Sequence, residues 1–295
     1  MPGTEGSEHE KNRIEAGTLY LVSTPIGNLA DLSERAVKVL SEVDFVAAED
    51  TRNSGLLLAR IGVRKPMISY FEHNKRERGE EIAARLGAGE SCALVTDAGT
   101  PAISDPGEDL VALCAERGIP VHTVPGPVAS IAALTVSGLP TGRFCFEGFL
   151  PVAKTERRER LEALRGETRT MLFHEAPHKL LRTLEDLADA FGEDRRIAIC
   201  RELTKINEET LRMTVGEALA YYRAKEPRGE FVLVVEGCSG TGGEIAFWQA
   251  LDVPAHVAHY EGQGMSRMEA IKQTARDRGV PKNEIYSRMV TEKEN

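Results

Sequence analysis

Short apolar runs alternate with helical patterns along most of this chain, and this alternation limits the folds that are open to it. Between residues 18 and 138 such runs occur at 18–23, 44–49, 67–70, 92–97 and 121–125. The stretches between them carry apolar residues at helical spacing. Strands that alternate with helices predict a mainly parallel sheet covered by helices, which is an α/β fold.

Capping residues predict where two helices of this region begin and end. Asp31 stands where a helix cap is expected, and Glu34 follows it by three residues. Asp105 and Pro106 predict the start of a second helix, because a capping side chain followed by proline is typical of a first turn. Gly118 predicts the end of that helix, since glycine is the usual residue just past a helix C-terminus.

A second α/β run covers residues 143–237, with predicted strands at 144–149, 170–175, 196–202 and 231–237. A chain of 295 residues exceeds the size at which one hydrophobic core usually stops growing. The segment 138–142, which contains two glycines and a proline, is the predicted domain boundary. We therefore expect a disordered tail at 1–16, one α/β domain at 17–140 and a second at 141–238.

A small helical unit is predicted within residues 239–295, after a linker rich in serine, threonine and glycine. Ser266 and Glu269 match a capping box, Gly279 marks the end of that helix, and Pro281 precedes another short helix. Two short helices joined by a tight turn resemble a helix-turn-helix. This unit either contacts RNA or only packs on the rest of the protein. Its basic residues are Arg267, Lys272, Arg276, Lys282 and Arg288.

Polar and glycine-containing loops follow several of the predicted strands. They lie at 24–28, 48–52, 96–107, 125–127 and 201–205. Ligand crevices in open α/β sheets form at the carboxyl ends of strands, so loops that converge on one edge favour a binding site. The chain has no GxGxxG fingerprint and no Walker A sequence, which argues against nicotinamide dehydrogenases and P-loop proteins.

Composition excludes several classes of protein. The net charge of −9 argues against a protein that grips nucleic acid through many phosphate contacts, so an RNA substrate must be recognised largely by shape. Five scattered cysteines predict reduced thiols in the cytoplasm and no metal site. No apolar run approaches the roughly 20 residues of a membrane span, so no membrane association is expected.

The motifs TPIGNLADLSERA, AEDTR, TDAGTPAISDPG, PGP, FCFEGFLP, HEAPHKL, RELTK and RGEFVLVVEG occur here in order. In this the chain resembles the RsmI-type 16S ribosomal RNA 2′-O-methyltransferases of the tetrapyrrole (corrin/porphyrin) methylase superfamily. The resemblance implies a two-domain tetrapyrrole-methylase fold, S-adenosylmethionine as cofactor and a homodimer. It also implies a cytidine of the decoding region, in the small ribosomal subunit, as substrate. The implied cofactor residues are Pro25, Gly27, Asp97, Ala98, Gly99, Thr100, Ile103, Val128, Ala129, Ser130, Glu175, Leu203 and Gly229.

The chemical groups of S-adenosylmethionine suit several of these implied cofactor residues. The apolar run after Pro127 starts a helix whose free amides could receive the methionine carboxylate. Ile103, Val128 and Ala129 would supply apolar walls for adenine, while Asp97 would either engage the amino group of the cofactor or cap a turn. In the motif HEAPHK, His174 stands where such proteins often have an aromatic residue.

The acceptor chemistry is predicted at 201–205, where charges follow a buried strand abruptly. Lys205 would stabilise the developing alkoxide, and Glu202, beside Arg201, would orient Lys205. Because burial lowers the pKa of a lysine, Lys205 is also a candidate to accept the proton. Glu49 and Asp50 are the next candidates. Two other readings stay open: a tetrapyrrole or diphthine methyltransferase, and a catalytically silent ribosome-assembly factor.

Overall fold

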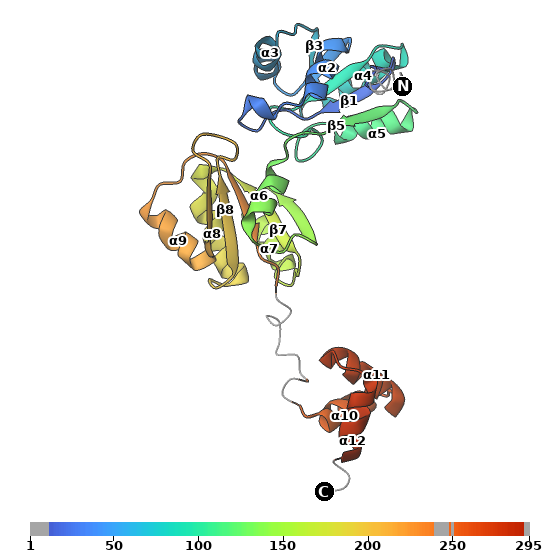
Figure 1. Cartoon of the computed structure of the whole chain (residues 1–295), viewed down its shortest axis with the longest axis vertical. Coiled ribbons are helices and arrows are strands. Elements are labelled where there is room, and N and C mark those ends of the chain that lie inside the picture. The colour runs from blue at the N-terminus through green and yellow to red at the C-terminus, as the bar shows by residue number, and fades with distance from the viewer. Residues whose placement is uncertain (1–11, 239–247, 249–250, 292–295) are drawn as a thin grey trace, which may run out of the picture. The chain divides into compact units, whose positions relative to one another are not determined.

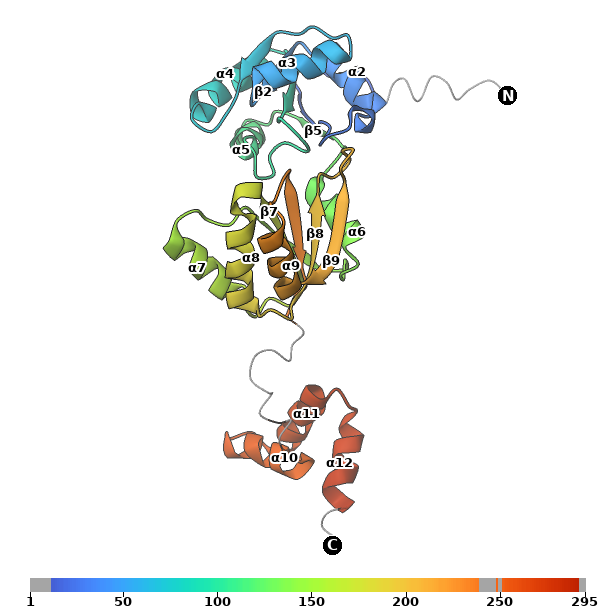
Figure 2. The same cartoon turned by 90° about the vertical axis from the view of Figure 1, so that its left-hand side faces the viewer.

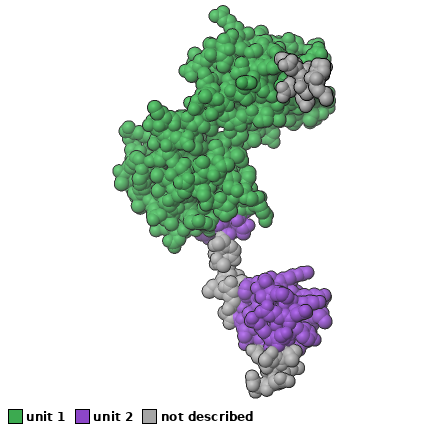
Figure 3. All heavy atoms as spheres, viewed as in Figure 1, with its two compact units in different colours: residues 1–162, 169–236 green, residues 163–168, 237–295 purple. Residues whose placement is uncertain are grey.

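A computed structural model describes residues 12–238, 248 and 251–291 of the chain. These form two compact units, one made of residues 1–162 and 169–236 and the other of residues 163–168 and 237–295 (Figure 3). Most of the predicted tail at 1–16 and most of the predicted linker lie outside the described residues. The predicted domain boundaries stay predictions.

The first sheet of the first unit is entirely parallel, with strand order β3-β2-β4-β1-β5, as the alternation in the sequence predicts (Figure 1). Helices α2 (Glu34–Glu42) and α3 (Thr51–Arg60) cover one face, and α4 (Lys75–Gly87) and α5 (Glu108–Glu116) cover the other. The strands are β1 (Leu19–Val22), β2 (Phe45–Ala48), β3 (Met67–Ser69), β4 (Cys92–Val95) and β5 (Val121–Val124).

Strand residues alternate between these two helical layers. Val46 and Ala48 of β2 face α2 and α3, whereas Phe45 and Ala47 face α4 and α5, and all four are fully buried. A strand buried on both faces must be apolar at every position, which is why the runs in the sequence are continuous. The carboxyl ends of β1, β2, β4 and β5 consequently meet along one edge of a rigid sheet.

Two predicted helix starts are wrong, and both helices begin later. Asp31 ends a short 3-10 helix, η1 (Leu29–Asp31), and Ser33 caps α2 by accepting a hydrogen bond from the Ala36 amide at 3.1 Å. The cap of α5 is Gly107 and not Asp105. In each case a turn inserted before the helix places the predicted cap outside it.

The second sheet is mixed, with order β6-β7-β10-β8-β9 (Figure 2). Only β6 and β7 run parallel to each other, and the remaining neighbours are antiparallel. The strands are β6 (Phe144–Gly148), β7 (Thr170–Glu175), β8 (Arg196–Arg201), β9 (Glu209–Thr214) and β10 (Phe231–Val235). The sequence predicts four of them and misses β9, which is an edge strand of half-exposed residues without an apolar run.

Helices cover both faces of this second sheet. Helix α6 (Ala129–Ser137) packs on one face through Ala133 and Leu134, before the predicted boundary at 138–142 is reached. Helices α8 (Pro177–Phe191) and α9 (Val215–Ala224) cover the other face. Helix α7 (Lys154–Ala163) joins α8 through Arg157, whose guanidinium bonds Asp186 at 2.6 Å and Thr183 at 2.7 Å.

The second unit is helical, as predicted. It contains α10 (Val253–Gly262), α11 (Arg267–Arg278) and α12 (Lys282–Thr291) around a small core that includes Val257, Ala270 and Ile285. The capping box of Ser266 and Glu269 is present, and Gly279 ends α11 in the left-handed conformation. No helix in the part of the chain that the structure describes has the length and apolar character of a membrane span. None of the five cysteines, all of which lie within the described residues, forms a disulfide bond.

Candidate active site

The loops that follow β1, β4 and β5 are tied together at the edge of the first sheet. Thr24 and Gly99 exchange two backbone hydrogen bonds, of 2.8 and 3.1 Å, in an antiparallel bridge just beyond the parallel strands. The hydroxyls of Ser23 and Thr100 lie 2.7 Å apart, and Thr100 also donates to the Pro127 carbonyl at 3.3 Å. These bonds fix three strand-end loops as one surface.

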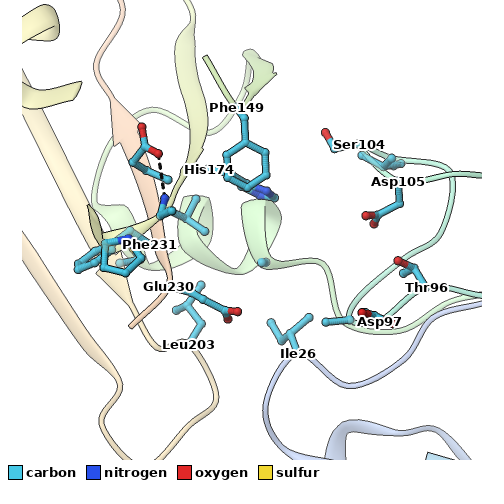
Figure 4. Close-up of a pocket in the computed structure, with 18 of the residues that line it drawn as sticks. Ile26, Thr96, Asp97, Ser104, Asp105, Phe149, His174, Leu203, Glu230 and Phe231 are labelled. Atoms are coloured by element: carbon cyan, nitrogen blue, oxygen red, sulfur yellow. Dashed lines mark hydrogen bonds between the residues drawn. The ribbon is translucent and has the colours of Figure 1, made fainter. Parts of the chain in front are cut away.

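A large cavity of about 600 Å³ opens between this surface and the second sheet. In Figure 4, Thr96, Asp97 and Asp105 lie on one side of it, and Leu203, Glu230 and Phe231 lie on the other. Its size falls within the range of small-molecule and cofactor sites in proteins. Its walls combine apolar side chains with a concentration of carboxylates.

The carboxylates gather where β2 and β4 end. Glu49 accepts a hydrogen bond from the Thr96 hydroxyl at 2.8 Å, and Asp97 and Asp105 line the cavity beside them. Burial raises the pKa of Asp105 to about 6, and the nearby negative charge of Glu49 acts in the same direction. Three acidic side chains around one space favour a ligand that carries positive charge.

The loop that holds Asp105 has an unusual backbone. Ala102 and Ser104 adopt φ angles of 66° and 60°, the left-handed region that costs a non-glycine residue free energy. Such conformations persist where the surrounding structure enforces them, commonly at functional sites. In this protein the strained loop presents Ile103, Ser104 and Asp105 to the large cavity.

His174 lies in the cavity wall between two phenylalanines. Its ring makes edge contacts with Phe146 and Phe149 at centroid distances of 5.3 and 5.5 Å. Burial lowers the pKa of His174, so the ring is neutral near pH 7. Its Nε2 atom is buried and has no hydrogen-bond partner within the described residues, which leaves it available to a polar ligand.

Glu175 is a buried carboxylate that is hydrogen-bonded to groups of the protein itself. It accepts hydrogen bonds from the Ala176 amide at 2.8 Å and from the Thr183 hydroxyl, which Arg157 also contacts. Buried charges are retained when such partners surround them. Glu175 therefore shapes the cavity wall and orients the start of α8.

Lys205 forms a charged bridge near the opposite wall. Its ammonium contacts Glu202 at 2.9 Å and Glu230 at 2.8 Å. Burial acts to lower the pKa of Lys205, but the bonds to Glu230 and Glu202 outweigh it, and the pKa is raised. This corrects the expectation that burial lowers it. Lys205 stays protonated and suits the role of a fixed cation, not that of a base.

Two glycines allow the chain to close around this bridge. A side chain at Gly27 would meet the Lys205 stem at 2.5 Å, and one at Gly229 would meet the Glu202 side chain at 2.6 Å. Both residues also have positive φ angles, of 151° and 89°. Glycine at these positions lets the loop after β1 touch the segment 202–205 of the second sheet.

A second cavity, of about 280 Å³, lies against helix α3 and is called the α3 cavity below. The loop after β1 forms one wall through Thr24, Pro25 and Gly27, and α3 forms the other. Asp97 lines both this cavity and the large one.

The predicted site residues fall into three groups. Those that line the large cavity are Glu49, Asp97, Ala98, Ile103, Ala129, Glu175 and Leu203. Pro25 and Gly27 line the α3 cavity, again with Asp97. The remainder line neither cavity: Asp50, Gly99, Thr100, Val128, Ser130, Arg201, Glu202, Lys205 and Gly229.

Several residues of the third group have identifiable structural roles. Asp50 caps α3, accepting from the Arg52 amide at 2.8 Å, and this bonding to Arg52 lowers the pKa of Asp50 to about 2. Arg201 pairs with Glu209 on the neighbouring strand at 3.1 Å. Val128 precedes the first turn of α6, and no side chain caps that turn.

Phe231 and Glu230 also line the large cavity, although neither is among the site residues predicted from the sequence. Phe231 begins β10 and Glu230 precedes it, whereas the predicted site residues come from the loops that follow strands. Because β10 runs antiparallel to β7 and β8, its first residue, Phe231, pairs with Glu175 and Arg201 at the ends of those strands. In an antiparallel sheet the start of one strand lies beside the ends of its neighbours, so a prediction of antiparallel pairing would have placed both residues at this edge.

The tetrapyrrole (corrin/porphyrin) methylase family model matches residues 18–219 of the chain. Among curated proteins, the "Ribosomal RNA small subunit methyltransferase I" of Halalkalibacterium halodurans is 47% identical over 94% of this chain and 96% of its own length. The protein of the same name from Escherichia coli O157:H7 is 43% identical over 95% of this chain and 96% of its own.

Solved structures show the same fold at low identity. A uroporphyrin-III-C-methyltransferase from Thermus thermophilus is 20% identical, with a TM-score of 0.54 over 78% of this chain and 98% of its own. Cobalt precorrin-4 methyltransferase is 18% identical, with a TM-score of 0.55 over 75% of this chain and 95% of its own. Since the family model covers more than half of the chain and the curated relatives cover nearly all of it, the chain belongs to the tetrapyrrole methylase family and, within it, to the ribosomal RNA small subunit methyltransferase I proteins.

Proposed function

We propose that this methyltransferase uses S-adenosylmethionine to methylate the ribose 2′-hydroxyl of a decoding-region cytidine in 16S ribosomal RNA. The small ribosomal subunit is the proposed substrate particle, and a cytoplasmic homodimer is the proposed active form. The observation that carries the proposal is the large cavity, lined by carboxylates and apolar side chains, in a chain whose relatives are named for small-subunit RNA methylation.

The residues of the large cavity fit S-adenosylmethionine. The cofactor carries a sulfonium and an ammonium group, and Asp97 and Asp105 offer negative charge to these cations. Ile103, Ala129 and Leu203 offer apolar surface to adenine. No side chain caps the first turn of α6, so its backbone amides remain for the methionine carboxylate.

The bound cofactor supplies a methyl group that is already activated by its positive sulfur. Transfer breaks the bond from this carbon to sulfur and forms a bond to the hydroxyl oxygen, whose proton must pass to a base. The protein's own contribution is alignment, which is worth roughly 7 to 11 kcal/mol when reacting atoms are well placed. We propose Glu49, a carboxylate of the large-cavity lining, as the group that takes the proton.

Methyl transfer to isolated small subunits tests the proposed function. With methyl-labelled S-adenosylmethionine we expect label in 16S RNA, and nuclease digestion followed by chromatography should give 2′-O-methylcytidine. Label in a base would contradict the ribose assignment. Label in a tetrapyrrole acceptor, or cofactor binding without any transfer, would favour one of the two alternative functions.

The acidity of Asp105 predicts a pH dependence of cofactor binding. Because its pKa is about 6, Asp105 is negative at pH 7.5 and neutral at pH 5.5, so attraction for the cationic cofactor is lost on acidification. Calorimetry should show the dissociation constant of S-adenosylmethionine rising roughly three- to fivefold over this range, as for one partly screened charge pair. In Asp105→Asn the constant should already be high at pH 7.5 and change less.

The comparison of the parent with Asp105→Asn isolates Asp105 from the other titratable side chains that line the cavity. Stability gives a second readout. A carboxyl whose pKa is raised in the folded protein destabilises it progressively as the pH rises from the ordinary pKa of the carboxyl, about 4, to its pKa of about 6 in the folded state. Asp105→Asn should therefore melt higher than the parent at pH 7.5, and this difference should shrink as the pH falls towards 4. Glu116→Gln, at an exposed site on α5, is the matched control. Identical pH curves for Asp105→Asn and the parent would contradict the assignment.

We propose that Lys205 supplies a fixed positive charge at the border of the two cavities. It contacts Glu230, which lines the large cavity, and Gly27, which lines the α3 cavity. Glu202 holds it in place, and Arg201 braces the adjoining strand. Lys205 is therefore a positioning and electrostatic residue beside the acceptor.

Replacing Lys205 separates this role from a simple grip on phosphate. In Lys205→Met the single-turnover methylation rate at saturating subunit should fall tenfold or more, because a transition-state charge is lost, while cofactor affinity changes less than twofold. Lys205→Arg keeps the charge and should retain most of the rate. An unaltered rate combined with weaker subunit binding would show that Lys205 only grips phosphate.

We propose that the second unit contacts RNA through three cations at the turn between α11 and α12. Lys272, Arg276 and Lys282 line an open cavity of about 400 Å³, and none of them forms an ion pair within the described chain. Arg267 and Arg288, by contrast, lie near Glu261 and Glu284, at 4.0 and 2.7 Å.

This difference provides a matched pair of variants for the second unit. Replacing Lys272, Arg276 and Lys282 together by glutamine should weaken binding to small subunits and lower the slope of log affinity against log salt by about two. Replacing Arg267 and Arg288 should change neither quantity. Cofactor affinity should be the same in all three proteins. Unchanged subunit binding in the triple variant would favour a unit that only packs on the rest of the protein.

A further inference from the structure

Helix α3 has two different faces. Ser54 and Leu58 point into the core of the first sheet, and both are buried. Asn53, Leu56, Leu57 and Arg60 stand at positions i, i+3, i+4 and i+7, which places them on one stripe of the helix, and this stripe lines the α3 cavity. Leu56 is 67% exposed, so this apolar stripe does not serve the core.

The lining of the α3 cavity changes from polar to apolar to cationic. At the end shared with the large cavity, the Asn53 amide donates to Oδ2 of Asp97 at 3.0 Å, and no group in the described residues bonds Oδ1. Leu56 on α3 and Leu29 on the loop after β1 are both exposed apolar members of the wall. Arg60 forms no ion pair within the described residues.

These three zones match the three parts of a nucleotide. An apolar wall suits the face of a base, an unpaired guanidinium suits a phosphate, and a carboxylate beside an amide suits ribose hydroxyls. A tetrapyrrole, which is larger and carries several carboxylates, would need more cations than the one arginine of this lining. A second copy of the chain on this surface would not explain the carboxylate and the amide at the inner end of the cavity.

The position of the cavity also fits an acceptor. Methyl transfer requires donor and acceptor atoms to be neighbours, and Asp97 borders both the large cavity and the α3 cavity. We propose that the α3 cavity binds the acceptor nucleotide of the RNA, with the base against Leu29 and Leu56, a phosphate on Arg60, and the ribose at Asp97. This assignment rests on the proposed function, since it places the acceptor beside the proposed cofactor site.

Cytidine 5′-monophosphate is a probe that tests the site without requiring methyl transfer. In the full-length protein labelled at leucine methyl groups, titration with this nucleotide should shift the resonances of Leu29, Leu56 and Leu57 together and saturably. Arg60→Gln should weaken this binding about tenfold, as expected for loss of one charge-assisted hydrogen bond. Arg64→Gln, an exposed arginine outside the cavity lining, is the matched control and should bind as the parent does.

Small subunits provide the second arm of the experiment. Arg60→Gln should raise the KM for subunits and lower the salt slope of subunit binding by about one, with cofactor affinity unchanged. Nucleotide binding at the leucines without any methyl transfer by the parent would sustain the site and overturn the proposed reaction. Methyl transfer by the parent with no leucine shifts, and with equal KM in both arginine variants, would overturn the site and leave the reaction standing.

Sedimentation distinguishes the remaining occupant, a second copy of the chain. The parent, Arg60→Gln and Leu56→Asn should share one oligomeric state at micromolar concentration, because the proposed site faces RNA. If the parent is a dimer and these substitutions make it a monomer, the α3 cavity is a subunit interface and the proposal is wrong. A parent that is a fully active monomer would refute the homodimer and leave the nucleotide site in place.

Discussion

The backbone pairing of Thr24 with Gly99 is the interaction on which the rest of the site depends. It continues the contact between β1 and β4 after their parallel ladder has ended, and it reverses the chain direction of one partner. The pairing holds the loop after β1 against the loop after β4, and side chains of these loops point into two different cavities. Ile26 then reaches the large cavity, Pro25 and Gly27 reach the α3 cavity, and Asp97 reaches both.

The two sides of the large cavity carry charge in different ways. On the first sheet Asp105 lies in a strained loop close to Glu49 with its pKa raised, so its negative charge is destabilising until a cation arrives. On the second sheet Glu230 lines the cavity and is paired with Lys205. Glu202, outside the lining, is matched by the Glu230 amide and by the same lysine, and these bonds lower the pKa of Glu202. A cationic ligand relieves the unfavourable charge of carboxylates that have no positive partner, and this relief favours binding. The carboxylates that are already paired with Lys205 mainly fix the geometry. The acidic side is therefore the side that selects the ligand.

The fold could be predicted from the sequence wherever burial dictates composition. Strands covered on both faces, such as β2 and β4, must be apolar throughout, and they stand out in the sequence. The edge strand β9 escapes this rule because its residues are half exposed. Helix starts are less predictable, since Asp31, Ser33 and Asp105 all fit a capping pattern and only the chain's path decides which of them caps.

The lining of the candidate site could be predicted from the sequence only in part, and for a related reason. Loops after parallel strands can be located from the sequence, and Asp97, Ala98 and Ile103 indeed line the large cavity. Glu230 and Phe231 precede their strand, so only the antiparallel direction of β10 reveals them. Asp97 lines the cavities and Asp50 caps a helix because their side chains point in different directions. Local sequence patterns do not predict that direction.

An acidic enzyme that acts on RNA must keep its negative charge away from phosphates. Its carboxylates Glu49, Asp97 and Asp105 line the large cavity, where the proposed ligand is a cation. Arg60 in the first unit and Lys272, Arg276 and Lys282 in the second are exposed cations that line cavities and form no ion pair within the described residues. Few phosphate contacts give weak binding to RNA in general, so affinity for the correct particle must come from shape and from the acceptor nucleotide itself. A net charge of −9 then contributes to specificity, because it repels RNA that cannot place a nucleotide beside Asp97.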